Sequence, residues 1–327
     1  AKEFGDALRL ALEQTVVVRG ARPISRTASI GIAMLPVSEA LSDAMRLADD
    51  FAREAKKRGR NMVCASEEEE LRALGLRGTF ITLKDLQSAL EGGEMQYYVQ
   101  PIWNVKKKRI EGFEALIRWI QPEGIIVMPG LFIGLLHEVI RKPKYLSFKT
   151  QLRKDLMSKL SAFPSQYVSF NFNLEQLSYA GAAQDVHKTL SGIIDHPGRE
   201  IIIEISEKAM NSRTNLQVLK AEIVALQDYG YKIALDDFGV EASNLNRMQQ
   251  FPISILKIDQ ALIKDINTSE VQRATLRGLE LITQSLGIKV IVEGIESIDQ
   301  AHYLYQIGFY SHQGYLHAHP MPPEDVV

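Results

Sequence analysis

Cysteine is almost absent from this chain, and its scarcity narrows the class of protein. Cys64 is the single cysteine among 327 residues, so no intramolecular disulfide can form. Disulfide-free chains are typical of reducing compartments, and we expect a cytoplasmic protein, with an upstream membrane or sensor region left open. No uninterrupted apolar run approaches the ~20 residues that a membrane-spanning helix needs. We therefore expect no membrane contact within this stretch of chain.

An excess of charge of one sign is also lacking. Lysine and arginine number 38, and aspartate and glutamate number 40, which gives a formal net charge of −2. A balance this close to neutral gives no general attraction to a phosphate polymer, so we expect neither DNA nor RNA polymer as a partner. The first residues, AKEFGDALRLALEQ, contain neither an apolar signal core nor an initial methionine. We expect no export signal here and a fragment of a longer protein.

The pattern of residues changes along the chain and predicts two domains joined by a linker. Residues 1–65 contain two helical patterns with a β-like run, TASIGIAM, between them. Residues 66–80 begin with SEEEELRALG, which we interpret as an acidic, solvated linker without chemistry. Residues 81–327 are long enough for a second, larger domain of their own.

Apolar runs and helical patterns alternate in the second domain and predict an α/β fold. Eight β-like runs occur there, namely MQYYVQPIW, GFEALIRW, YVSFNF, EIIIEIS, YKIALDD, ISILKID, IKVIVEGI and FYSHQGYLH. Helical patterns separate most of them, for example at 145–163, 215–230 and 270–287. Eight strands that alternate with helices are the rhythm of a (β/α)8 TIM-type barrel, and an open, doubly wound sheet is the alternative.

Acidic side chains lie inside or at the ends of these apolar runs, where charge is normally excluded. They are Glu114, Glu204, Asp236, Asp237, Asp259, Glu293 and Glu296. A single carboxylate at a strand end is most often the N-cap of the next helix. Several carboxylates that end neighbouring buried strands would repel one another unless cations lay between them, so the repetition favours a metal site. It also favours the barrel, which collects the carboxyl ends of all its strands on one face.

On that face we expect ten polar side chains to gather, namely Glu114, Asn171, Glu204, Asp236, Asp237, Lys257, Asp259, Glu293, Glu296 and Gln313. Their ligand atoms are mostly oxygen, which selects Mg²⁺, Mn²⁺ or Ca²⁺ over metals that prefer sulfur. The adjacent Asp236 and Asp237 indicate a carboxylate that bridges two ions, the arrangement used for phosphoester hydrolysis. Lys257 fits either a group that holds a water molecule or an ordinary exposed lysine at a strand end.

Eight segments of residues 96–327, in order, resemble the EAL family of cyclic di-GMP phosphodiesterases. These segments are YYVQPI, EALIRW, SFNFNLEQL, IEISE, ALDDFG, ISILKID, VIVEGIES and HQGYLHAHPMP. The resemblance implies a (β/α)8-type barrel with an atypical first strand, which cleaves cyclic di-GMP to linear pGpG with two Mg²⁺ or Mn²⁺ ions. It also implies cyclic di-GMP as the partner and a homodimer formed through this domain.

The resemblance assigns roles to individual residues. The ligands of one ion would be Glu114, Asn171, Glu204 and Asp236, and those of the second Asp236, Asp237 and Glu293. Lys257 would place the attacking water, so the candidate catalytic residues are Lys257, Glu293 and Glu114. The residues expected to contact the dinucleotide or line the site are Gln100, Arg118, Gln313, Asp259 and Glu296.

Three segments depart from the pattern of the family. DFGVEASNL stands where DFGTGYSSL is usual, so Val240 and Glu241 replace a hydroxyl residue and a glycine. FNFN stands for VNLS, with Asn171 retained, and LHEVIRK stands for AEETGLI. Each candidate ligand is retained, so we expect the chemistry to survive, whereas the changed loop is expected to lower its rate and affect dimerisation. Ca²⁺ prefers more ligands at longer distances and is expected to inhibit.

Residues 1–64 resemble the carboxyl half of a GGDEF (diguanylate cyclase) domain through TASIGIAMLP and RLADDFAREAKKRGRNMV. No GG(D/E)EF stretch is present, so this part is not expected to make cyclic di-GMP.

Two alternatives to a cyclic di-GMP phosphodiesterase remain. One is a receptor that binds cyclic di-GMP without cleaving it and relays its binding to a partner, although such receptors usually lose the EAL glutamate or a DDFG aspartate. The other is a barrel phosphohydrolase with a different substrate. The histidines of HQGYLHAHP, namely His312, His317 and His319, are interpreted as ordinary surface or loop residues rather than a metal cluster.

Overall fold

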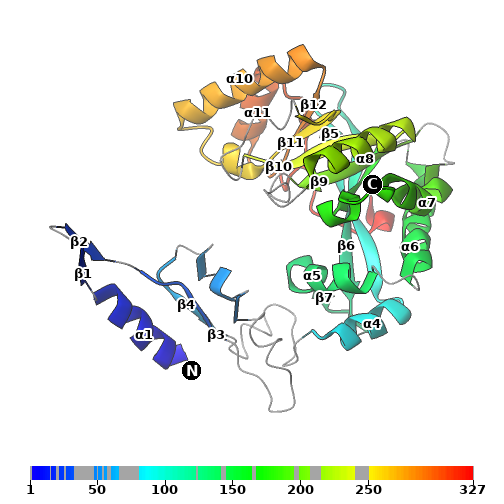
Figure 1. The fold of residues 1–327 in the computed structure, drawn as a ribbon. Coiled ribbons are helices and arrows are strands. Elements are labelled where there is room, and N and C mark those ends of the chain that lie inside the picture. The colour runs from blue at the N-terminus through cyan, green and yellow to red at the C-terminus, as the bar shows by residue number, and fades with distance from the viewer. Residues whose placement is uncertain are drawn as a thin grey trace. The chain divides into compact units, whose positions relative to one another are not determined.

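The structure is a computed structural model, drawn in Figure 1. It describes residues 2–14, 16–19, 22–25, 27–32, 48–49, 51–53, 55–56, 60–65, 81–122, 124–140, 145–163, 167–194, 199–206, 215–239 and 250–326. The chain divides into two compact units, Ala1–Phe80 and Ile81–Val327, each of which is described by itself. None of the helices in the described ranges is long and apolar enough to cross a membrane.

The first unit contains a helix and two small sheets. Helix α1 (Lys2–Gln14) precedes the antiparallel strands β1 (Val16–Arg19) and β2 (Arg22–Ser25), and β3 (Ile30–Ile32) pairs in parallel with β4 (Val63–Ala65). The predicted first helix and the strand in TASIGIAM are confirmed as α1 and β3. The second predicted helix lies largely outside the described residues, with helical backbone at 48–49, 51–53 and 55–56.

The second unit is built from strands that alternate with helices (Figure 1). Its strands are β5 (Met95–Asn104), β6 (Arg109–Ile120), β7 (Ile126–Val127), β8 (Tyr167–Phe172), β9 (Glu200–Ser206), β10 (Lys232–Phe238), β11 (Ile255–Ile258), β12 (Lys289–Val292) and β13 (Ser311–His312). Its helices are α4 (Leu83–Glu91), α5 (Pro129–Ile140), α6 (Leu146–Lys159), α7 (Ala182–Ile194), α8 (Leu216–Asp228), α10 (Glu270–Leu286) and α11 (Ile298–Gln306).

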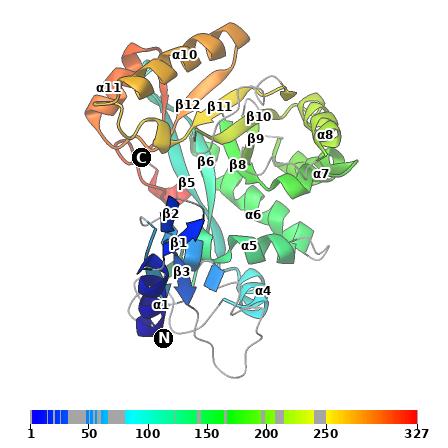
Figure 2. The ribbon, with the colours of Figure 1, turned by 60° about the vertical axis from the view of Figure 1, so that its left-hand side comes forward.

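The strands close into a barrel. The order is β5-β13-β12-β11-β10-β9-β8-β6, and β6 pairs again with β5. Strand β5 runs antiparallel to both neighbours, whereas the pairings from β6 to β13 are parallel. The predicted (β/α)8 barrel with an atypical first strand is therefore confirmed, and closure excludes the open, doubly wound sheet. Helices surround the strands, as the turned view in Figure 2 also shows.

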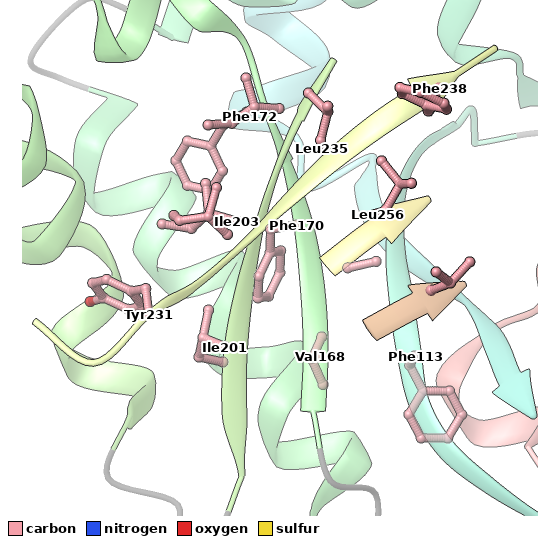
Figure 3. Close-up of a cluster of buried hydrophobic side chains, with 14 of the residues drawn as sticks. Phe113, Val168, Phe170, Phe172, Ile201, Ile203, Tyr231, Leu235, Phe238 and Leu256 are labelled. Carbon is pink, nitrogen blue, oxygen red and sulfur yellow. The ribbon is translucent and has the colours of Figure 1, made fainter. Parts of the chain in front are cut away.

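Alternation along the strands separates the two faces of the barrel wall. On β8, Val168, Phe170 and Phe172 belong to the large apolar cluster that packs against the helices (Figure 3). The intervening residues of β8 face the barrel interior, because successive side chains of a strand point to opposite sides. Asn171 is one of them, and its amide lies exposed at the carboxyl end of β8, on the interior side of the barrel wall.

A buried polar cluster joins the first residues of several strands, at the end of the barrel opposite the carboxyl ends. Glu111, which is 3% exposed, accepts a hydrogen bond from Tyr167 Oη (3.1 Å) and lies 2.7 Å from Lys289 Nζ. Burial raises the pKa of the Glu111 carboxyl, but Lys289 and the hydrogen bonds around it outweigh burial and lower the pKa. The ion pair between Glu111 and Lys289 therefore provides partners for the buried polar groups at this end of the barrel, far from the acidic residues of the other end.

The interpretation of all three histidines as surface residues is wrong for His312. It lies on β13 with none of its surface exposed, and its Nε2 atom is 3.0 Å from the carbonyl oxygen of Phe309. Its Nδ1 atom is buried without a hydrogen-bond partner, and its ring lies 5.7 Å from that of His317. Burial lowers the pKa of His312 to about 4. The sequence did not reveal this because a two-residue strand leaves no alternation to detect.

We predict that His312 makes the barrel sensitive to acid. Its pKa is lower in the folded chain than the ordinary value of 6.5, so the unfolded chain binds more protons between these values. Its contribution to stability is therefore present above about pH 6.5 and is lost as the pH falls through 4. Between pH 7 and pH 5 the free energy of unfolding should fall by about 2 kcal/mol from this residue.

Urea denaturation of the wild type, His312→Asn and His319→Asn at the two pH values measures this loss. His319 is exposed and serves as the matched control, which should keep the wild-type pH dependence. An unchanged pH dependence in His312→Asn would contradict the prediction.

Candidate functional site

Lys257 lies at the carboxyl end of the barrel with none of its surface exposed. Its Nζ atom is 2.7 Å from Glu293 Oε1, 2.8 Å from Glu204 Oε2, 3.1 Å from Glu114 Oε2 and 3.5 Å from Asp236 Oδ1. The interpretation as an exposed strand-end lysine is therefore wrong. Strand β11 is flanked by β10 and β12, and the side chain of its third residue points into the barrel rather than to solvent.

The register of the parallel strands explains why the carboxylates meet. Glu204 pairs with Asn171 across β8 and β9, and Glu114 pairs with Gln100 across β5 and β6. The pairing of β6 with β8 ends at Ala115. Only the part of β6 that pairs with β8 belongs to the barrel wall, and Glu114 lies at the carboxyl end of that part, although the strand itself continues to Ile120. The closed barrel brings these strand ends to one face.

Two amide side chains orient Glu114, and a third supports one of them. Asn171 Nδ2 donates to Glu114 Oε1 (2.8 Å), and Gln313 Nε2 donates to Glu114 Oε2 (2.6 Å). Gln313 Nε2 also donates to Gln100 Oε1 (3.0 Å), and Gln100 Nε2 donates to the carbonyl oxygen of Ala318 (3.1 Å). Both oxygens of Glu114 are thus engaged, and a fixed carboxylate is what a binding site for a cation or a phosphate ester needs.

Asp237 follows Asp236 directly, in an unusual backbone conformation. Its backbone adopts φ +60°, a left-handed conformation that costs a non-glycine residue about 1–3 kcal/mol and that gathers at functional sites. Its Oδ2 atom accepts a hydrogen bond from Ser206 Oγ (2.9 Å). Ser206 was not among the sequence candidates, and its signal is its position two residues after Glu204 on the same face of β9.

A cavity of about 430 Å³ adjoins the cluster. It is lined by Gln100, Glu114, Leu116, Asp259, Gln260, Glu293, Gly294, Glu296, Gln313, Gly314 and Tyr315. Six of these were predicted, and sequence reasoning missed Leu116, Gln260 and Tyr315. Tyr315 is 57% exposed and its ring stacks on that of His319 with centroids 4.0 Å apart. An exposed aromatic ring beside a polar cavity can stack on a planar ligand.

Two predicted site residues have other contacts. Arg118 does not line the cavity; its Nη1 atom donates to the carbonyl oxygen of Ile117 (2.9 Å) and its guanidinium lies 5.7 Å from the ring centre of Tyr98. Asp259 lines the cavity, and its Oδ1 atom also accepts a hydrogen bond from the backbone N–H of Ala261 (2.7 Å). The general N-cap interpretation of strand-end carboxylates therefore holds for Asp259.

Electrostatics divide the carboxylates into two kinds. Burial raises the pKa of Glu204 to about 8, and burial likewise raises the pKa of Glu293 well above its usual range. Burial also acts on Glu114, but Lys257 and the amide hydrogen bonds outweigh it and lower the pKa. For Lys257 burial acts to lower the pKa, and the four carboxylates raise it well above its usual value. Lys257 is therefore charged at neutral pH.

A hard divalent cation fits the donors of this site. They are carboxylate and amide oxygens, and Glu204 Oε1 and Asp236 Oδ1 are buried without a hydrogen-bond partner. Yet among the described residues no group of three or more His, Cys, Asp or Glu is arranged to hold a metal ion. Four carboxylate oxygens converge on Lys257 Nζ instead, so the donor chemistry fits while the present arrangement is organised around an ammonium group.

The altered segments cannot be placed in full. Val240, Glu241 and the rest of 240–249 lie outside the described residues, so the predictions for the loop stay predictions. The segment LHEVIRK begins in α5 and its last residues, 141–142, also lie outside them.

Comparison with known proteins places the second unit. The EAL domain model matches residues 83–320. The bifunctional diguanylate cyclase/cyclic di-GMP phosphodiesterase MucR of Pseudomonas aeruginosa is 28% identical over 346 residues, which cover 100% of this chain and 48% of MucR. The chain spans from 30% to 52% of the length of the curated relatives it matches.

Solved structures agree with the barrel. A structure described as PaMucR phosphodiesterase in a c-di-GMP complex matches with a TM-score of 0.64 and 25% identity, over 75% of this chain and 99% of that one. Klebsiella pneumoniae BlrP1 in a manganese and cyclic di-GMP complex matches with a TM-score of 0.58 and 25% identity, over 71% of this chain and 57% of that one.

We predict that Gly314, beside the cavity, tolerates no side chain. A Cβ atom there would lie 2.2 Å from the carbonyl oxygen of Ile295, and the backbone has φ +156°. Gly314→Ala should lower the free energy of unfolding by about 2–4 kcal/mol. In urea denaturation, Gly278→Ala on α10 is the matched control, since nothing lies within 4 Å of its Cβ. The free energy of unfolding of Gly278→Ala should be about 0.5–1 kcal/mol higher than that of the wild type. Equal effects of the two substitutions would contradict the prediction.

Proposed function

This chain belongs to the EAL domain family through residues 83–320, and from that premise we propose that it hydrolyses cyclic di-GMP to linear pGpG. Relatives in the family are named as cyclic di-GMP phosphodiesterases. The observation that carries the proposal is the convergence of Glu114, Glu204, Asp236 and Glu293 on one point beside a cavity of about 430 Å³. A cavity of this size lies within the range that holds small-molecule ligands.

The proposed ligands of two Mg²⁺ or Mn²⁺ ions are Glu114, Asn171, Glu204 and Asp236 for the first and Asp236, Asp237 and Glu293 for the second. Such ions supply charge neutralisation at the phosphate and an acidified water. Glu114 is prepared for this role because Asn171 and Gln313 fix both its oxygens. The amide of Asn171 bonds to Glu114 through nitrogen, which leaves its carbonyl oxygen available as a donor to a cation.

Besides holding the ions, the chain's own residues have two tasks. We assign to Lys257 the placement of the attacking water, since its ammonium is charged and lies among the proposed ligands. Contacts to the dinucleotide are assigned to Gln100, Arg118, Gln313, Asp259 and Glu296. Four of these five residues line the cavity, and Arg118 does not. For Arg118 to contact the dinucleotide, its guanidinium must give up its hydrogen bond to the carbonyl oxygen of Ile117.

A second candidate function is a receptor that binds cyclic di-GMP without cleaving it. The specific observation in its favour is that the described carboxylates form no ready-made group for a metal ion, because they surround Lys257. Retention of each proposed ligand favours hydrolysis, since a receptor has no need of them.

For the first unit we propose that residues 1–65 are the carboxyl half of a GGDEF-like domain and residues 66–80 a linker to the EAL domain of 81–327. The alignment with MucR, which is named as a bifunctional cyclase and phosphodiesterase, covers this part of the chain and supports the proposal.

We also propose a homodimer formed through the EAL domain. Val271, Ile282 and Leu286 are 77%, 36% and 54% exposed, and their spacing places them on one face of α10. This helix lies on the outside of the barrel (Figure 2). An apolar face of this kind on a surface helix suits a second copy of the same helix.

The assay that tests the function uses cyclic di-GMP with Mg²⁺, Mn²⁺, Ca²⁺ or a chelator. We expect pGpG with Mg²⁺ or Mn²⁺, none with chelator, and inhibition by Ca²⁺, whose longer contacts and higher ligand number suit in-line attack poorly. Glu114→Gln should lower turnover at least about 100-fold with normal folding. Glu111→Gln, at the other end of the barrel, is the control.

Binding of cyclic di-GMP without turnover under each condition would favour the receptor. Near-normal turnover in Glu114→Gln would remove that residue from the proposed ligands.

Sedimentation tests the dimer. Val271→Glu should raise the dissociation constant of the dimer about tenfold or more, because each of the two copies then places a charge on the shared apolar face. Val224→Glu on α8, 42% exposed, is the matched control and should leave the equilibrium unchanged. A monomeric wild type, or equal behaviour of the two variants, would contradict the assignment of α10.

A further inference from the structure

The ammonium of Lys257 occupies the point on which four carboxylates converge, and a divalent cation would need those same oxygens. We propose that Lys257 is the tethered counter-cation of the metal-free site, and that a divalent ion must displace its ammonium group in order to bind. This inference rests on the proposed metal-dependent function. The two proposed roles of Lys257 then belong to different states: it holds the carboxylates together before the ions bind and places water afterwards.

The charges of the cluster require a cation at its centre. Glu204 and Glu114 are 1% and 6% exposed, and unpaired buried carboxylates would cost several kcal/mol each. In the described part of the chain, Lys257 is the one cation within ion-pair distance of Glu114, Glu204, Asp236 and Glu293. The amides of Asn171 and Gln313 supply hydrogen bonds to Glu114 but no charge. The metal-free cluster therefore depends on this ammonium.

The distances around Lys257 Nζ fit an ammonium group and not a divalent ion. Contacts of 2.7–3.1 Å to Glu293, Glu204 and Glu114 suit an ammonium group. Oxygens bind Mg²⁺ at about 2.0–2.1 Å and Ca²⁺ at about 2.3–2.6 Å. One set of oxygens cannot hold the ammonium and the ion at the same point, and two cations so close would repel strongly. Ion binding therefore requires the ammonium to move away from the centre.

The unused oxygens show where the exchange can begin. Glu204 Oε1 and Asp236 Oδ1 are buried without a hydrogen-bond partner, although the latter lies 3.5 Å from Lys257 Nζ. These two atoms belong to neighbouring strands, β9 and β10, whose residues 204 and 236 lie on the same face of the sheet. These two acceptors would be available to an ion while Lys257 still keeps its contacts to Glu293 and Glu114, so Lys257 would not need to leave the site before an ion binds.

The test measures ion binding and folding of the full chain, without turnover. Lys257→Met removes the tethered cation and keeps most of the side-chain volume. We expect Mn²⁺, titrated by calorimetry, to bind at least about tenfold more tightly to this variant than to the wild type, because no ammonium competes. In chelator the variant should unfold at a lower urea concentration than the wild type, and saturating Mn²⁺ should remove most of that difference.

Lys289→Met is the matched control, since Lys289, which is half-buried, forms an ion pair with the buried Glu111 at the opposite end of the barrel. It should also lower stability in chelator, but Mn²⁺ affinity should stay at the wild-type value and Mn²⁺ should not correct the loss. Equal or weaker Mn²⁺ binding in Lys257→Met than in the wild type, or no binding to either, would overturn the proposal.

A second measurement covers the case in which Lys257→Met does not fold. In ¹⁵N-lysine-labelled wild type, Mg²⁺ should shift the side-chain ammonium resonance of Lys257, identified by its absence in Lys257→Arg, and speed its proton exchange. An ammonium signal that stays unchanged at saturating Mg²⁺ overturns the proposal. The outcome is separable from the proposed function. Displacement of the Lys257 ammonium by Mg²⁺ without formation of pGpG would support the inference and refute hydrolysis. Formation of pGpG with an ammonium signal that does not change would support hydrolysis and refute the inference.

Discussion

The ion-pair cluster around Lys257 is the interaction on which the rest of the barrel depends. Four carboxylates from four strand ends would repel one another in a buried space, and a single ammonium 2.7–3.5 Å from each offsets part of this repulsion. Burial and the neighbouring carboxylates still raise the pKa of Glu204 and of Glu293. A buried ion pair is weak evidence of stability in itself, because desolvation offsets most of its attraction. Its value here lies in specificity, since it holds the ends of β6, β9, β10 and β12 in one arrangement.

The barrel gives this cluster its setting. Closure through the antiparallel β5 brings Gln100 beside Glu114, and the parallel neighbours set Asn171 opposite Glu204. Apolar side chains on the outer face of the strands pack under the helices, as Figure 3 shows for β8, β9 and β10. The opposite end is closed by the separate ion pair of Glu111 with Lys289. A closed wall with polar strand ends is suited to a preorganised site.

Much of this could be predicted from residue patterns. All eight predicted strands of the barrel are found, and the helix predicted over 270–287 begins at its Ser269 cap and ends at Gly287, whose φ is +66°. Hydrophobic periodicity and helix caps are local signals, so they can be recognised within a short stretch of sequence. The hairpin β1–β2 was not predicted, because its strands have too few residues for a period. Strand β13 was predicted, but its two residues leave no alternation that distinguishes a buried side from an exposed one, so buried His312 was mistaken for a surface residue.

The sequence by itself determined which chemical groups are present, on which strands they stand and which face of each strand they share. Only the tertiary structure decided how they meet. That Lys257 is buried among the carboxylates rather than exposed, that Gln100 contacts Gln313 across 213 positions, and that Arg118 lies outside the cavity follow from barrel closure and strand register. Register is a relation between segments far apart in the chain, set by the packing of all strands together, so no local pattern of residues contains it.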